Sequence, residues 1–205
     1  MSGVKIVVRM VGSDVRQRVQ HGRRAPRWAE RLWIDPERCV SVAPALDRGR
    51  RLSGQVVGGE WSVEPLETVA KIRMAVEHWR TGRTWEAVGA YDYLVAHQAD
   101  LQDRDGYRTR EDIRRRFRSL DDMFETMRCD GRLRTRAELE GRARREHLGV
   151  YVHIAGGGVP VFGNGGCHRL AAAQVLRLPE IPIQLGAIHP DALTHLAALR
   201  SPPHG

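Results

Sequence analysis

Three glycines, an asparagine and a Cys-His-Arg triplet lie close together in the segment VPVFGNGGCHRLAAAQVL, residues 159–176. Glycine lets the backbone approach a ligand closely because it has no Cβ. The first amides of a helix carry partial positive charge and point outward, which favours phosphate. Arg169 adds a fork of donors that matches phosphate oxygens. A strand, a glycine loop and a helix in this order therefore predict a phosphate- or nucleotide-binding site.

Each residue of the loop has a predicted role and an alternative. We expect Gly163, Gly165 and Gly166 to supply positive φ and close backbone approach, and Asn164 also tolerates the left-handed region. The alternative for these four is a plain tight turn. We expect Arg169 to clamp phosphate, and the alternative is an arginine exposed on a helix.

His168 and Cys167 are candidates for catalysis beside this clamp. We expect His168 to bond a phosphate oxygen or to orient the loop. The alternative is that it acts as an internal cap. An ordinary imidazole pKa near 6.5 allows both charge states. Cys167 stands at a helix start beside Arg169, where a thiol pKa falls and thiolate becomes available. The alternative is that Cys167 is only a small residue that fits the turn.

Phosphoryl chemistry also needs metal ligands or a base. Glu60, in the glycine-flexed sequence GGEW, is the catalytic candidate among the acids. Asp121, Asp122 and Glu125 are further candidates, although the two aspartates also suit the charge of a helix end. The residues alone do not identify the metal ligands.

Aromatic and basic residues offer two other contacts for a nucleotide or a nucleic acid. Trp61, Trp79 and Trp85 are candidates to stack on a base, although Trp79 and Trp85 lie on apolar helix faces that suit a core. The arginine runs at 114–116 and 142–145 either contact phosphate backbones or form solvated helix surfaces.

Hydrophobic spacing predicts the elements that must position these residues. The chain mixes short strands with helices, and helices dominate its middle. A capping-box pattern at Thr135 and Glu138 starts one short helix, and Gly82 and Gly131 are helix ends. Pro182 suits an edge strand. The predicted strands are 5–11, 32–34, 149–154, 159–162 and 181–185, and the predicted helices are 63–79, 85–95, 113–127 with a new start at Ser119, 135–144, 170–176 and 190–199.

The composition narrows the class of protein. The 205-residue chain has a net charge of +8, and all but two of its 33 basic residues are arginine. A basic surface suits nucleic acid, but a GC-rich genome produces the same arginine bias. Cys39, Cys129 and Cys167 are too widely spaced for a disulfide framework or a zinc site. Without a signal peptide or a run of about 18 apolar residues, we expect a cytoplasmic protein with no membrane partner.

The segment GNGGCHRLAAAQVLRLPEIPIQL resembles the ParB/sulfiredoxin superfamily. Its members share a strand, a glycine-containing loop ending in His-Arg or Arg-Arg, a helix rich in alanine and leucine, and a further strand after an IPV-like turn. Gly165, His168, Arg169 and residues 179–183 fit that pattern. The upstream segment SLDDMFETMRCDGRL is also similar, so the resemblance covers residues 119–188.

The resemblance implies a fold and a class of ligand. The expected fold is α+β, a ParB/sulfiredoxin-like small mixed sheet with surrounding helices. We expect a mostly helical extension over 1–118, the ParB/sulfiredoxin-like domain over 119–200 and a disordered tail over 201–205. Members of the superfamily bind nucleotides through this loop: sulfiredoxins use ATP and magnesium to repair over-oxidised cysteine, and ParB proteins hydrolyse CTP on DNA. The fold alone does not choose between these reactions.

Three functional hypotheses follow. The preferred one is a Mg²⁺-dependent nucleotide hydrolase or phosphotransferase that holds the phosphates of ATP or CTP at residues 163–169. The first alternative is a non-catalytic ParB-like protein that binds DNA through arginine-rich surfaces. The second is sulfiredoxin-like thiol chemistry at Cys167. The chain departs from both well-known branches, since it has no recognisable helix-turn-helix half and a long segment before the motif.

Overall fold

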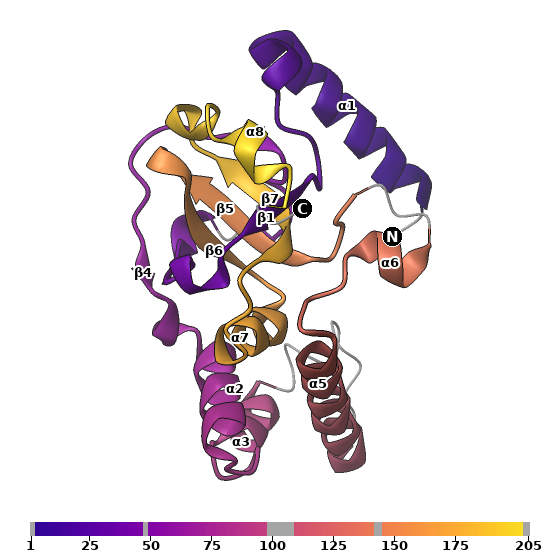
Figure 1. Cartoon of the computed structure of the whole chain (residues 1–205), viewed down its shortest axis with the longest axis vertical. Coiled ribbons are helices and arrows are strands. Elements are labelled where there is room, and N and C mark those ends of the chain that lie inside the picture. The colour runs from indigo at the N-terminus through magenta and orange to yellow at the C-terminus, as the bar shows by residue number, and fades with distance from the viewer. Residues whose placement is uncertain (1–2, 47–48, 98–108, 142–144, 203–205) are drawn as a thin grey trace.

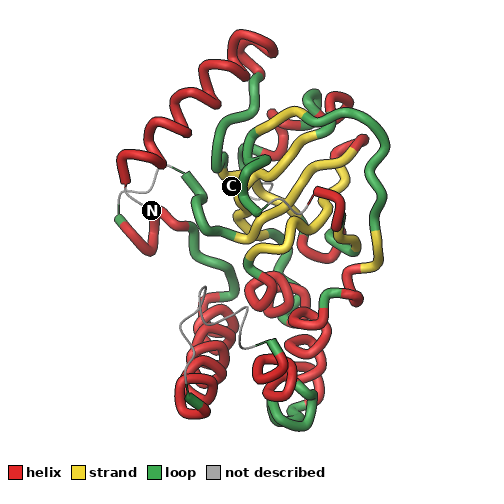
Figure 2. The backbone as a smooth tube through the Cα atoms, turned by 180° about the vertical axis from the view of Figure 1, so that it is seen from behind, coloured by secondary structure: helices red, strands yellow, loops and turns green. Residues whose placement is uncertain are grey.

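The computed structural model describes residues 3–46, 49–97, 109–141 and 145–202. It contains one mixed β-sheet with helices around it, which confirms the predicted α+β class. Figures 1 and 2 show the sheet at one end of the molecule and two groups of helices, here called the helical limbs, at the other end. One helix lies between the sheet and the limbs. That central helix is α7 (Cys167–Val175), and the limbs are α5 (Arg110–Asp130) and the pair α2 (Ala70–Thr81) and α3 (Ala90–Ala96).

The sheet has seven strands and mixes parallel with antiparallel pairs. Strands β5 and β6 form an antiparallel hairpin, β5 pairs with β7 in parallel, and β1 pairs with β7 antiparallel. Figure 2 shows these strands lying side by side. The order is β1 (Arg31–Ile34), β7 (Ile181–Ile188), β5 (Val150–Ala155), β6 (Val159–Gly165), β2 (Ser41–Val42) and β4 (Glu64–Pro65), and β3 (Gln55–Val56) also pairs with β7.

Strand β7 lies in the interior of the sheet, and every one of its residues is buried. The prediction that residues 181–185 form an edge strand was therefore wrong. Pro182 is tolerated because the pairing of β5 with β7 begins only at Ile183, so the missing proline N–H lies outside that ladder.

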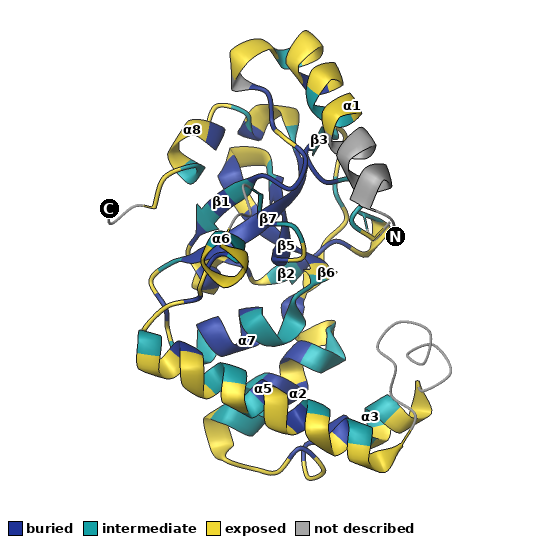
Figure 3. Cartoon of the chain, turned by 90° about the vertical axis from the view of Figure 1, so that its right-hand side faces the viewer, coloured by how far each residue is buried: buried dark blue, intermediate teal, exposed yellow. Residues whose placement is uncertain are grey.

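The alanine-rich sequence of α7 lets this helix lie close to its neighbours. Ala171, Ala172 and Ala173 are fully buried, and α7 packs against α2, α5 and β5. Figure 3 shows the buried residues concentrated in the sheet and on the inward faces of these helices. Small side chains permit close packing, so α7 and the loop before it are held firmly by the core.

Local capping signals fix several helix ends. Thr135 and Glu138 form the predicted capping box of α6 (Arg136–Glu140), and Gly82 ends α2 in the left-handed conformation as expected. A second capping box at Thr109 and Asp112 starts α5. The predicted new helix start at Ser119 does not occur, because α5 continues through this residue to Asp130, with Gly131 as the expected helix end.

Of the predictions near the two ends of the chain, one was wrong and one was wrong in part. Residues 5–11 belong to the helix α1 (Gly3–His21) and not to a strand. Apolar residues at Val11, Val15 and Val19 repeat every four positions, which is a helical spacing. The predicted helix over 190–199 is divided into a 3₁₀ turn and the short α8 (Leu196–Leu199).

The sheet draws on both sides of the predicted domain boundary. The boundary between residues 118 and 119 falls inside α5. Strand β1 pairs with β7 and β2 pairs with β6, so the N-terminal part of the chain supplies strands as well as helices. Residues 203–205 of the predicted tail and 142–144 of the predicted fourth helix lie outside the described residues.

Candidate functional site

The glycine loop joins β6 to α7 in a very short turn. Strand β6 ends at Gly165 and α7 starts at Cys167, with Gly166 as its N-cap. Gly166 has φ +82° and Asn164 has φ +58°, as predicted for left-handed positions. The first amides of a helix have no acceptor within it, so this end of α7 offers donors to an anion.

Gly163 and Gly165 are required for space and not for φ. The prediction of positive φ was wrong for these two. A Cβ at Gly163 would lie 2.5 Å from Cδ1 of Tyr151, and one at Gly165 would lie 2.9 Å from Cβ of the same tyrosine. The loop therefore lies directly against Tyr151 of β5. The predicted close approach of these glycines to a ligand stays a prediction.

A cavity of about 1330 Å³ opens beside this loop. One part of its wall is the loop itself with Cys167, His168 and Arg169. The other parts come from segments far apart in the sequence. Its arginine and lysine lining residues are Arg50, Arg51, Lys71, Arg116, Arg136 and Arg169, and its larger apolar and aromatic ones are Trp28, Met74, Trp85, Tyr93, Leu94, Phe117, Leu120, Met123, Leu148 and Tyr151.

The described charged side chains that line the cavity are all of the same sign. Six side chains that line it are cationic, and among the described lining residues none is an aspartate or a glutamate. Like charges at close range repel each other in a medium of low dielectric constant. An anion in the cavity would relieve this repulsion, and a cationic ligand would increase it.

Arg169 lies at the first turn of α7, as predicted. Its Nη2 donates to the carbonyl oxygen of Leu148 at 2.6 Å, which ties the helix start to the segment before β5. Burial lowers the pKa of Arg169, the charge of Arg136 lowers it further, and Glu146 opposes this shift. The guanidinium keeps further N–H donors beyond the one bonded to Leu148.

Arg50 enters the cavity from the segment before β3. Its guanidinium donates to the Gln184 side chain and, at 2.9 Å, to the carbonyl oxygen of Gly149. It also lies 5.2 Å from the centre of the Tyr151 ring. Burial and the charge of Arg169 lower the pKa of Arg50 to about 10. This arginine is thus fixed in place by three contacts beside the glycine loop.

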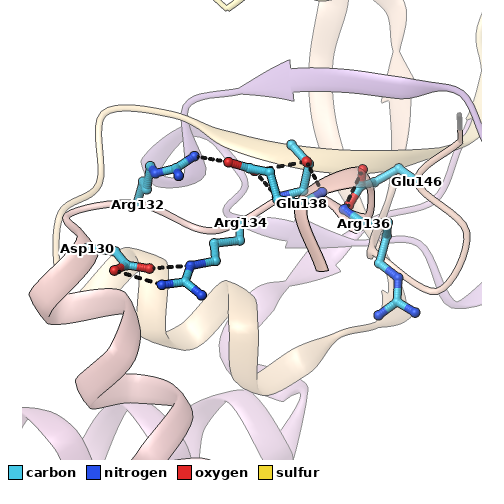
Figure 4. A network of polar contacts seen from close by, with 7 residues as sticks. Asp130, Arg132, Arg134, Arg136, Glu138 and Glu146 are labelled. Carbon is cyan, nitrogen blue, oxygen red and sulfur yellow. Dashed lines mark hydrogen bonds and ion pairs between the residues drawn. The ribbon is translucent and has the colours of Figure 1, made fainter. Parts of the chain in front are cut away.

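Arg136 is brought to the cavity by a polar network around α6 (Figure 4). Its backbone N–H donates to Oε1 of the buried Glu146 at 3.0 Å, and Glu146 also accepts from Nε of Arg31 at 2.7 Å. Arg134 pairs with Asp130 at 2.6 Å, which joins the segment before α6 to the end of α5. Figure 4 shows the Arg136 side chain pointing away from Glu146.

His168 lines the cavity as an uncharged imidazole. Burial lowers its pKa to about 3, and the charges of Arg116, Lys71 and Arg169 add to this shift. Its ring lies edge-on to Trp85 with ring centres 6.2 Å apart. Of the two predicted charge states, only the neutral one is populated near pH 7, so His168 contributes a hydrogen-bonding group and no positive charge.

Cys167 also lines the cavity. It is half-buried and interacts electrostatically with Arg50 and Arg169. The two other cysteines lie elsewhere. Cys39 is fully buried, and burial raises its pKa to about 12, while Cys129 is exposed on α5. Cys167 is therefore the cysteine that a ligand at the glycine loop would meet.

Glu60 does not line this cavity. It is exposed, and the adjacent Trp61 contacts the rings of His153 and His189 at 6.1 Å and 5.8 Å. His189 follows β7 and so marks the opposite end of the sheet strands from the start of α7. The structure does not bring the catalytic candidate Glu60 together with His168 and Arg169.

The acids of α5 that were metal candidates also lie outside the lining. Asp121 accepts hydrogen bonds from Trp79 and Trp85, and Asp122 and Glu125 are exposed. Of the three tryptophans considered for stacking, Trp85 alone is among the described lining residues.

Sequence reasoning found the loop but missed most of its cationic partners. Arg50 and Arg51 follow Gly49 in a stretch that seemed irregular, and a basic pair after a glycine was the available signal. Arg116 belongs to the arginine run 114–116, but Arg136 and Lys71 carried no signal of their own. Folding brings these residues to α7 from four separate segments.

Comparisons with known proteins add no identification: no family model matches the chain, and neither a curated protein nor a solved structure matches it. Within the described part of the chain, no helix has both the length and the apolar character needed to span a membrane.

Proposed function

We propose that this protein binds a nucleoside triphosphate, ATP or CTP, in the cationic cavity, with the phosphates at the glycine loop and the start of α7. The observation that carries the proposal is the convergence of this loop with six cationic side chains in one cavity. Backbone amides at a helix start and arginine forks both match the charge and the oxygen geometry of phosphate. Transfer of the terminal phosphoryl group to water or to a second substrate is the activity that we propose to accompany binding.

The described residues that line the cavity do not favour a Mg²⁺ ion held by the protein. Proteins that fix Mg²⁺ beside a nucleotide do so with one or two carboxylates, together with the phosphates. The described lining residues include no carboxylate, so they do not fit a protein-held Mg²⁺. We therefore assign the neutralisation of phosphate charge to the arginines and Lys71, and any Mg²⁺ to the nucleotide itself.

Calorimetric titration with ATP and with CTP, each with and without Mg²⁺, tests the proposal. We expect binding by the wild type, and affinity weaker by about 10- to 100-fold in Arg169→Ala, because a charge-assisted bond to phosphate is lost. Release of phosphate or of a phosphorylated product is measured in parallel.

Arg128→Ala is the matched control. Arg128 is exposed, lies on α5 and pairs with Glu125 at 2.7 Å, and it is not among the lining residues. This variant removes the same charge and should bind as the wild type does. The proposal fails if the wild type binds neither nucleotide, or if Arg169→Ala binds them equally well.

A further inference from the structure

We propose that the apolar end of the cavity, between α3 and α5, binds the base of the nucleotide whose phosphates lie at the glycine loop. This inference rests on the proposed function. It adds which wall of the cavity meets the organic part of the ligand, and it assigns a role to the helical limbs.

Large apolar side chains line the cavity between α3 and α5, where Arg116 of α5 is also part of the lining. Tyr93 and Leu94 of α3 face the cavity together with Phe117 and Met123 of α5. Tyr93, Leu94 and Met123 are half-buried, so their side chains keep surface that a ligand can cover. Aromatic side chains stack on the π-face of any base, and flexible methionine adapts to a flat partner.

A continuous series of ring contacts connects this apolar end to the loop. His168, the second residue of α7, lies edge-on to Trp85 at 6.2 Å. Trp85 in turn stacks on Phe117, with ring centres 4.8 Å apart and planes 11° from parallel. Trp85 and Phe117 are themselves buried in the core against which Tyr93, Leu94 and Met123 pack, so the ring contacts run from His168 to the support behind these three half-buried side chains.

Asp121 positions this support of the cavity wall. Its carboxylate accepts from Nε1 of Trp79 at 3.0 Å and from Nε1 of Trp85 at 3.1 Å, and it bonds Nε2 of His78 at 3.0 Å. His78 also stacks on Trp85 at 4.1 Å. One side chain of α5 thus fixes α2 and the turn after it, so the wall is formed before a ligand arrives, which reduces the ordering cost of binding.

Comparison of ATP, CTP and inorganic triphosphate on the full-length protein tests the inference. Triphosphate carries the phosphates without the base. We expect the wild type to bind either nucleotide at least about tenfold more tightly than triphosphate, since stacking of one base contributes that much affinity. In Leu94→Asn, nucleotide affinity should fall toward that of triphosphate, because a polar group replaces part of the apolar surface that the base would cover, while triphosphate affinity should stay at the wild-type value.

Val95→Asn is the matched control, because Val95 is the next residue of α3, is 46% exposed and is absent from the lining. It should bind both kinds of ligand as the wild type does. Unchanged triphosphate binding also shows that Leu94→Asn is folded. Equal affinities of the wild type for ATP, CTP and triphosphate would overturn the inference but leave the phosphate site in place, as would an equal loss of both in Leu94→Asn. Failure of the wild type to bind any of the three would instead overturn the proposed function.

Discussion

At the scale of single residues, the site depends on glycines whose missing side chains leave room for neighbouring atoms, as well as on the groups that the loop offers to a ligand. Gly163 and Gly165 leave room for Tyr151, and Gly166 has both a left-handed backbone and a neighbour within reach of any added side chain. With these glycines, β6 ends one residue before its junction with α7 at Gly166, and Arg169 in the first turn of α7 stays next to the loop.

Gly166→Ala should therefore lower both stability and nucleotide binding. The new Cβ would lie 2.9 Å from Cα of Val150 at φ +82°. Steric overlap and left-handed strain together should reduce the free energy of unfolding by roughly 2–4 kcal/mol. Gly82→Ala is the control, since Gly82 has φ +72° with nothing within 4 Å of the added atom and should lose only about 1 kcal/mol. Chemical denaturation measures the free energy of unfolding of the two variants. Equal losses would contradict the close approach of Gly166 to Val150.

His168 makes a prediction about acid stability. Its folded pKa of about 3 is below the unfolded value, so the unfolded chain binds the proton first as the pH falls. Stability should decrease between pH 6.5 and pH 3, and this histidine should account for roughly 3 kcal/mol of the loss between pH 7 and pH 4.

In His168→Asn the decrease in stability over that range should be smaller by this amount, as judged by urea denaturation at several pH values. His97→Asn, which changes an exposed histidine of the α3 limb, should keep the wild-type pH dependence. Parallel pH profiles for wild type and His168→Asn would show that the imidazole of His168 does not have the lowered pKa described above.

At the scale of elements, the carboxylate of Asp121 links α5 to α2 and to the turn after it, in addition to the stacking of Phe117 on Trp85. Asp121→Ala would leave the indole N–H groups of Trp79 and Trp85 without their acceptor. We expect the free energy of unfolding to fall by about 1–2 kcal/mol. The adjacent Asp122 is exposed, so Asp122→Ala should stay within about 0.5 kcal/mol of wild type. Thermal denaturation checks the pair, and similar effects of both changes would argue against the role of Asp121.

Elements with local signals could be predicted from the sequence, and elements defined by distant partners could not. The capping box at Thr135 and the end of α2 at Gly82 depend on residues within one helical turn. In contrast, the place of β7 in the interior of the sheet depends on β1 and β5. Valine is enriched in strands but also occurs in helices. For this reason residues 5–11 were assigned to the wrong element.

At the scale of the whole molecule, the net charge of +8 is partly concentrated in one cavity. The loop 163–169 could be predicted because its residues are contiguous. Its partners Arg50, Lys71, Arg116 and Arg136 could not, because only the tertiary fold brings them to the start of α7. For the same reason sequence reasoning proposed Glu60 for the site, although folding places it elsewhere.

A crystal structure of the protein with ATP or CTP bound would show directly whether the glycine loop holds the phosphates. We expect phosphate oxygens within hydrogen-bonding distance of the loop amides 163–169 and of the Arg169 guanidinium. Nucleotide bound at another surface, with this cavity empty in a crystal soaked above the solution Kd, would contradict this expectation.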